Sequence, residues 1–214
     1  MNASSTVSGS MNSMPYSERS AVASSPTPPR QVAFGRRDTR LEGYERARWH
    51  ARQHGYPPVE RSTGGRAVAF TGLTVAAVRA TPADATRTGV SDRYEDAIER
   101  FGAALARLDV DAEPGEPDAS FCPGTHSLQT RGKLVGLAQR VRGDVAVLAG
   151  VVVVRDREEM GAVLDPVYEA LGVPFDPASV GSVAAAGGPV DPQETVDTLE
   201  AVLTDDDTVV TQVG

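Results

Sequence analysis

The feature that most constrains the fold is an almost unbroken apolar run, VAVLAGVVVV, over residues 145–154. A membrane-spanning helix needs about 20 apolar residues, so this run is too short to be one. It is rich in valine, whose branched side chain favours extended backbone. A strand that is apolar at almost every position is buried on both faces. The run therefore predicts a strand in the middle of a sheet.

The other elements follow from periodicity and from turn residues. A second strand is predicted directly before the apolar run, from about Gly132 to Val141, and helical spacing separates such strand pairs. Strands that come in adjacent pairs, instead of alternating with helices, predict an α+β fold with a mixed, largely antiparallel sheet flanked by helices. The remaining predicted strands are 30–37, a hairpin over 59–70, and 73–80, and the helices are 39–54, 91–110, 157–172 and a last one from 192.

Two details of the helices are also predicted. Ser91 and Asp191 have the residue types that cap helix N-termini, so each is expected to begin a helix. The spacing of apolar residues in the first helix indicates an inward face made of Leu41, Tyr44, Ala47, Trp49 and Ala51.

The composition indicates how the chain is divided into domains and which classes of partner it excludes. Residues 1–29 are rich in Ser, Met, Asn and Pro and predict a disordered, low-complexity tail, which leaves 30–214 as one domain. The net charge of −8 argues against non-specific binding to nucleic acid, which needs clustered cations. There is no signal-peptide pattern, no run long enough for a membrane span, and only one cysteine. We therefore expect a cytoplasmic protein that binds neither nucleic acid nor membrane.

The only cysteine and the only lysine lie eleven residues apart, as Cys122 and Lys133, in the segment SFCPGTHSLQTRGKLVGLAQR. The other 20 basic residues are all arginine. Pro123-Gly124 forces a turn, so the thiol is expected in a loop. A thiol becomes nucleophilic beside a cation, and a lysine can lose its proton when desolvated, which an arginine cannot. Taken singly, the simpler interpretations are a buried inert cysteine and an exposed strand-end lysine.

A second segment, RSTGGRAV over 61–68, places two glycines between predicted strands. Paired glycines permit positive φ and leave backbone N–H groups bare, which suits an anion or an extended chain, although a tight turn is the common alternative. His50 and His54 lie four residues apart on the first helix, but no third ligand is evident. The sequence therefore predicts no metal site.

Together these two segments resemble the biotin/lipoate protein ligase and acyltransferase superfamily, over about residues 30–180. That family pairs Arg-x-Ser-Gly-Gly-x-Ala-Val with a Gly-Lys-x-x-Gly-x-Ala/Ser-Gln-Arg strand that holds an essential lysine. The SFCPG segment is most similar to the cysteine-dependent lipoyl/octanoyl amidotransferase branch. The resemblance implies that 30–214 is a biotin/lipoate ligase-like catalytic domain, with a fold like that of class II aminoacyl-tRNA synthetases.

The resemblance also implies an activity and its residues. The enzyme would move an octanoyl or lipoyl group to a lipoyl-domain lysine through a Cys122 thioester, with Lys133 activating the thiol, stabilising the oxyanion and passing a proton to the leaving amine. His126 would orient Cys122, and the glycines would line a tunnel for the acyl chain. The implied substrate-binding residues are Arg61, Ser62, Gly64, Gly65, Ala67, Gly136, Arg140 and His126.

Partners and alternatives follow from the same resemblance. The donor or acceptor would be a lipoyl-domain protein, either the glycine cleavage H protein or 2-oxoacid dehydrogenase E2, and a transferase would need no cofactor. The first alternative is an ATP-dependent lipoate-protein ligase, in which Lys133 holds an acyl-adenylate, Cys122 is incidental, and ATP and Mg are required. The second is a non-catalytic, carrier-binding paralogue.

Overall fold

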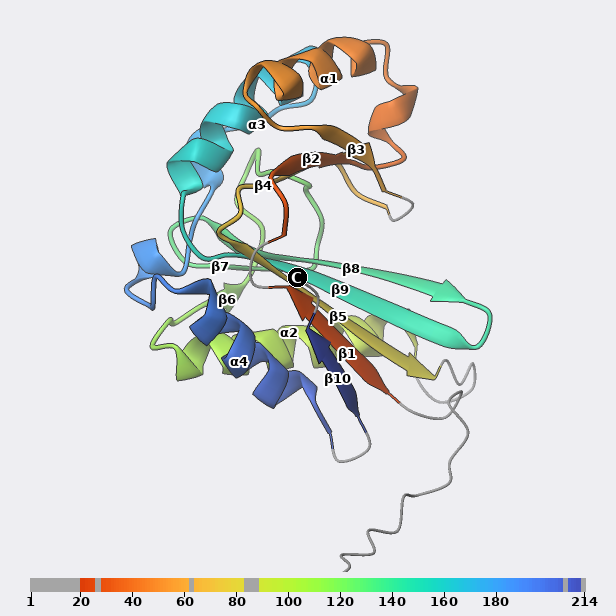
Figure 1. The fold of residues 1–214 in the computed structure, drawn as a ribbon, viewed down its shortest axis with the longest axis vertical. Helices are drawn as coiled ribbons and strands as arrows, with labels where there is room; N and C mark the ends of the chain where they lie inside the picture. Colours follow the sequence, from red (N-terminus) through yellow and green to blue (C-terminus); the bar gives the residue numbers. More distant parts are fainter. Residues whose placement is uncertain (1–19, 26–27, 62–63, 83–88, 206–207, 213–214) are drawn as a thin grey trace, which may run out of the picture.

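The computed structural model describes residues 20–25, 28–61, 64–82, 89–205 and 208–212. Within these residues the chain forms two β-sheets and four α-helices (Figure 1). The helices α2 (Val90–Arg107) and α4 (Pro192–Leu203) cover one face of the larger sheet. The smaller sheet lies on the other side, beneath α1 (Tyr44–Gln53) and α3 (Arg157–Leu171). Each helix pair shares a separate apolar core with its sheet.

The larger sheet has seven strands in the order β10-β1-β5-β9-β8-β7-β6. Neighbouring strands are antiparallel except β1 and β10, which are parallel. The apolar run forms β9, which lies between β5 and β8 and so confirms the predicted central strand. The strands are β1 (Ala21–Ser25), β5 (Thr74–Pro82), β6 (Glu113–Pro114), β7 (Ser127–Gln129), β8 (Lys133–Arg142), β9 (Val145–Val153) and β10 (Val209–Gln212).

The smaller sheet consists of β2 (Gln31–Phe34), β3 (Pro58–Glu60) and β4 (Val68–Phe70), in the order β3-β2-β4. The predicted hairpin across the two glycines is therefore wrong, because β3 and β4 pair with opposite edges of β2. Since β2 and β3 are parallel, α1 makes the crossover between them. The glycine segment then connects the two edges of this sheet and is not a tight turn.

Short 3₁₀ helices complete the fold at η2 (Asp38–Arg40), η3 (Pro177–Ser179) and η4 (Ala184–Ala186). The architecture is the predicted α+β arrangement with mixed, largely antiparallel pairing. Both sheets meet near the loop that carries Cys122, which packs against the core of the smaller sheet.

Three local predictions were wrong. Residues 21–25, assigned to the disordered tail, form β1, in which Val22 is buried against the core of the larger sheet. Trp49 is 52% exposed because it lies about 200° around the helix from Ala47. The cap of α2 is Gly89, whose N–H donates to the Asp92 carboxylate at 2.9 Å, so Ser91 is inside the helix. Asp191 does cap α4, as predicted.

Candidate functional site

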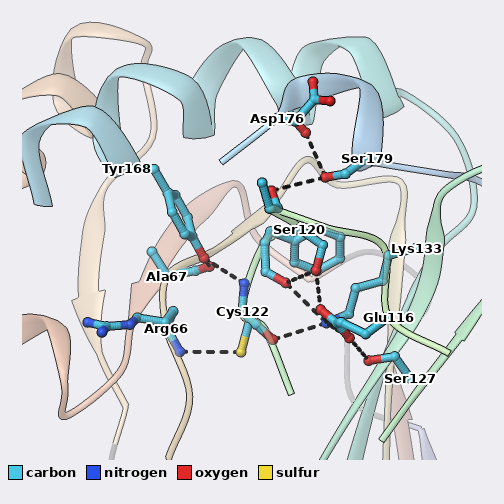
Figure 2. A network of polar contacts seen from close by, with 12 residues as sticks. Arg66, Ala67, Glu116, Ser120, Cys122, Ser127, Lys133, Tyr168, Asp176 and Ser179 are labelled. Carbon is cyan, nitrogen blue, oxygen red and sulfur yellow. Dashed lines mark hydrogen bonds and ion pairs between the residues drawn. The ribbon is translucent and has the colours of Figure 1, made fainter. Parts of the chain in front are cut away.

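Cys122 lies in the loop between β6 and β7, as its Pro-Gly sequence predicted. Its φ of +44° is in the left-handed region, which costs a non-glycine residue about 1–2 kcal/mol. The backbone N–H of Cys122 donates to the Tyr168 hydroxyl at 2.6 Å, and this hydroxyl donates to the carbonyl of Ala67 at 2.8 Å. Tyr168 therefore connects the strained loop to the residue preceding β4 (Figure 2). Burial raises the pKa of Tyr168 well above its usual value, which keeps this donor protonated.

The sulfur of Cys122 has two nitrogen neighbours. The backbone N–H of Arg66 donates to Sγ at 3.3 Å, and the Arg61 guanidinium lies 3.4 Å from the same atom. The Arg61 Nη2 also donates to the Arg66 carbonyl at 2.5 Å. The cation beside the thiol is therefore Arg61, where Lys133 had been expected. Cations and backbone N–H groups stabilise a thiolate, so this environment favours a nucleophilic sulfur.

Gly65 permits this close approach. Its φ is +90°, and a Cβ placed there would lie 2.6 Å from Sγ and 2.8 Å from the Arg61 guanidinium. A Cβ on Gly64 would meet no atom within 4 Å. Of the two glycines, only Gly65 must lack a side chain for the sulfur and the Arg61 guanidinium to fit. Ser62, also predicted as a substrate-binding residue, lies outside the described residues.

Lys133 begins β8 and is 1% exposed. Its ammonium lies 3.0 Å from both carboxylate oxygens of Glu116, 3.1 Å from the carbonyl of Phe121 and 3.0 Å from the carbonyl of Cys122. In Figure 2 it approaches Cys122 from the side of that carbonyl, while the sulfur faces Arg66. The structure thus brings the lysine to the backbone of Cys122 and gives the sulfur other partners.

Glu116 is the centre of this buried polar network. Besides Lys133, it accepts hydrogen bonds from the hydroxyls of Ser120 and Ser127. Gly136 lies beside the lysine, because a Cβ there would be 3.3 Å from Lys133 Cε. Gly136 therefore makes room for the lysine side chain.

Two predicted residues lie elsewhere. The ring of His126 stacks on the Tyr94 ring of α2, with 3.6 Å between centroids and 6° between planes, so it does not face Cys122. Arg140 pairs with Val147, seven residues along β8 from Lys133, which corresponds to about 23 Å of extended strand. The sequence motif predicted that both residues lie close to the site. Arg140 lies too far along β8, and stacking on Tyr94 directs the His126 ring away from Cys122.

Three residues that contact the candidate site were not predicted from the sequence. They are Glu116, Tyr168 and Asp38, whose buried carboxylate accepts from the N–H of Gly35 at 3.0 Å and from the Arg66 guanidinium at 3.3 Å. Burial raises the pKa of Asp38, and those two hydrogen bonds offset part of this effect. Only Glu116 had a sequence signal, since it lies in the acidic loop six residues before Cys122.

The described residues contain no group of three or more His, Cys, Asp or Glu side chains arranged to hold a metal ion. No helix in that part of the chain is long and apolar enough to cross a membrane.

Known proteins resemble this chain in sequence and in fold. Over 118 residues the chain is 35% identical to the octanoyl-[GcvH]:protein N-octanoyltransferase of Geobacillus kaustophilus (strain HTA426), a match that covers 54% of this chain and 42% of that protein. The chain thus spans less than half the length of this curated relative.

Solved structures show the same fold at lower identity. A lipoate-protein ligase A bound with ATP superposes with a TM-score of 0.69 at 17% identity, covering 94% of this chain and 79% of the other. The bi-partite lipoate protein ligase of Thermoplasma acidophilum, studied with its E2 lipoyl domain, gives 0.67 at 16% identity, covering 94% and 78%. The model of the lipoyl protein ligase A/B catalytic domain matches residues 24–204. That match covers most of the chain, including the paired glycines and the strand that begins with Lys133, so the chain belongs to the family of lipoyl protein ligase A/B catalytic domains.

Proposed function

We propose that the protein transfers an octanoyl or lipoyl group to a lipoyl-domain lysine through a thioester on Cys122. The observation that carries this proposal is the setting of the sulfur, which lies 3.3 Å from the Arg66 N–H and 3.4 Å from the Arg61 guanidinium. An inert cysteine needs no such donors, whereas a nucleophilic thiolate does. The similarity to an octanoyltransferase that acts with GcvH supports the same activity.

The chemistry has two matched half-reactions. In the first, the Cys122 thiolate attacks the acyl carbonyl of the donor, a C–S bond forms, and the carbonyl π electrons move to oxygen. Collapse of this intermediate breaks the C–N bond, and the departing lysine amine takes up the proton that the thiol gave up. In the second, the amine of the acceptor lysine attacks the thioester, which reverses these steps and restores the thiol.

Lys133 is the proton carrier in this proposal. Its amino group lies 3.0 Å from the Cys122 carbonyl and 3.0 Å from the Glu116 carboxylate, so it is buried beside the reacting residue. In the thioester mechanism this ammonium carries the proton that the Cys122 thiol gave up; it stabilises the oxyanion, passes that proton to the leaving nitrogen, and takes one back from the attacking amine in the second half-reaction.

The same contacts argue against the ATP-dependent ligase. The Lys133 ammonium has three N–H groups and four protein acceptors within 3.1 Å, including both oxygens of the Glu116 carboxylate. Either mechanism must turn one N–H of this ammonium from a protein acceptor to the substrate, but an acyl-adenylate would also place its phosphate next to the Glu116 carboxylate, which repels it. The proposed transferase uses neither ATP nor Mg, and its donor and acceptor are lipoyl-domain proteins such as the glycine cleavage H protein and E2.

Intact mass spectrometry tests the proposal. Mixing the protein with octanoylated H protein is expected to add one hydroxylamine-sensitive octanoyl group, and Cys122→Ser is expected to abolish this gain. A ligase would instead acylate the acceptor only with free octanoate, ATP and Mg, whatever residue 122 is. A protein that binds the carrier but transfers nothing under either condition would be the non-catalytic paralogue.

A further inference from the structure

Positive charge is concentrated in one part of this acidic chain. The segment Arg30–Arg66, which builds most of the smaller sheet and α1, carries nine arginines and four acidic residues, a net charge of +5. Residues 67–214 carry 11 basic and 24 acidic residues, a net charge of −13. Such segregation produces a field that attracts an acidic partner to one side of the molecule and repels it from the rest.

We propose that Arg36 and Arg37, at the edge of the Cys122 site, form the docking point for an acidic carrier domain. The proposal rests on the proposed function, because it assumes that an acyl-lysine on a carrier must reach Cys122. It adds the surface that the carrier contacts and the charge that the carrier must present there.

The position of the arginine pair is fixed by the site itself. Arg36 and Arg37 occupy the turn between β2 and η2, which closes when the Gly35 N–H donates to the Asp38 carboxylate. The Arg66 guanidinium donates to the same carboxylate, and the Arg66 N–H donates to the sulfur of Cys122. A chain of hydrogen bonds therefore leads from the turn to the thiol through one buried aspartate, Asp38.

Backbone packing gives an independent measure of this closeness. A Cβ on Gly35 would lie 2.1 Å from the carbonyl oxygen of Gly65, and Gly65 is itself in contact with the sulfur of Cys122. The residue that immediately precedes Arg36 thus packs against the residue that borders the thiol. A carrier bound at the turn would have its lysine arm within reach of the site.

The arginine pair is available for binding. Both side chains are exposed, and neither makes a hydrogen bond or ion pair with another residue of the described chain. Arg30, Arg48 and Arg66 of the same segment are each paired with a carboxylate. Two solvated guanidinium groups at the rim of a site suit carboxylates of a partner, where they increase the association rate and set the orientation.

The test compares two charge reversals of equal size. The first is the double variant Arg36→Glu/Arg37→Glu. The matched control is Arg107→Glu/Arg142→Glu, which changes two exposed arginines on α2 and at the end of β8. Two readouts are needed: acylation of Cys122 by S-octanoyl-N-acetylcysteamine, which needs no docking, and kcat/KM with octanoylated H protein at several salt concentrations.

The Arg36/Arg37 variant is expected to keep the small-molecule reaction within about two-fold of wild type. With H protein at low salt its kcat/KM should fall by about ten-fold or more, mostly through KM, and its salt dependence should flatten. The control variant should lose much less. Equal losses in both double variants would show that only the net charge matters and would overturn the proposal.

Two other outcomes also have a definite meaning. If the wild-type protein forms no Cys122 thioester with either donor, the proposed function fails first. If the wild type is acylated and the Arg36/Arg37 variant retains full activity with H protein but changes its mass by light scattering, the basic turn contacts a second copy of the chain, and the docking proposal is wrong.

Discussion

Replacing Gly65 by alanine tests whether the thiol is held where the structure places it. The new Cβ would lie 2.6 Å from the sulfur of Cys122 and 2.8 Å from the Arg61 guanidinium. Ordinary contacts begin near 3.4 Å, so the sulfur must move by about 1 Å, and a displacement of that size can cost about 100-fold in rate. Alanine at a φ of +90° adds about 1–2 kcal/mol of backbone strain.

Gly64→Ala is the matched control, because a Cβ at that neighbouring position meets nothing within 4 Å. Acylation of Cys122 and its alkylation by iodoacetamide, both followed by intact mass spectrometry, should slow by about 100-fold in Gly65→Ala and little in Gly64→Ala. The melting temperature of Gly65→Ala should fall by about 2–8 °C, as 1–2 kcal/mol does in a chain of this size.

The alkylation assay makes this prediction independent of the substrate. If both glycine variants react and melt alike, Gly65 is not in contact with the sulfur, and the assignment of Arg61 as the cation beside the thiol fails with it. If Gly65→Ala melts lower but is alkylated at the wild-type rate, the strain is real but the thiol is not positioned by this contact.

Three further predictions concern Tyr168, Glu116 and Tyr44. Tyr168→Phe leaves the Cys122 N–H and the Ala67 carbonyl without their buried partner, which should lower the free energy of unfolding by about 1–3 kcal/mol in urea titrations; an unchanged midpoint would contradict it. Glu116→Gln removes the charge opposite the buried Lys133 ammonium and should cost about 1–3 kcal/mol, reduced because Glu116 is partly exposed. Adding Lys133→Met should recover part of this loss, and simple additivity would refute the pairing. Burial and the hydrogen bond to Glu60 raise the pKa of Tyr44 from 10.0 to about 12; the folded protein then holds a proton that the unfolded chain releases, so stability is lost as pH rises through 10 to 12. The loss is about 1.4 kcal/mol per pH unit, and Tyr44→Phe should remove this share of the slope.

The sequence predicted the larger sheet better than the smaller one. The apolar run could only be a central strand, and β8 and β9 are neighbours both in the chain and in the sheet, so local pattern was sufficient. The pairing of β3 and β4 was misjudged because each contacts β2, which lies far from β4 in the sequence. Residues 21–25 were missed for the same reason: only β5 and β10, more than 45 residues away, show that a Ser-rich segment pairs as a strand.

The site was half predictable. The family motif identified Cys122, Lys133, Arg61 and Gly65, all of which the structure places around one loop. The motif does not show which cation meets the sulfur, since this depends on the path of the backbone at a φ of +44°. Tyr168 is more than 40 residues from Cys122 in the sequence, on a helix whose spacing indicated only a core side chain.

Arg61 and Lys133 have different contacts in the site, and this difference explains why a chain with 20 arginines has its one lysine at this place. The Nη2 of Arg61 contacts both the sulfur and the Arg66 carbonyl, using the two N–H groups that this one nitrogen carries. Lys133 is enclosed with Gly136 against its side chain, and its compact ammonium reaches acceptors in several directions. A planar guanidinium in that enclosure would be too large and could not aim at all of them, and it would not release a proton near neutral pH. Lys133→Arg is therefore not a conservative change: the fold at this position requires the small cation, and the proposed chemistry requires one that can lose its proton.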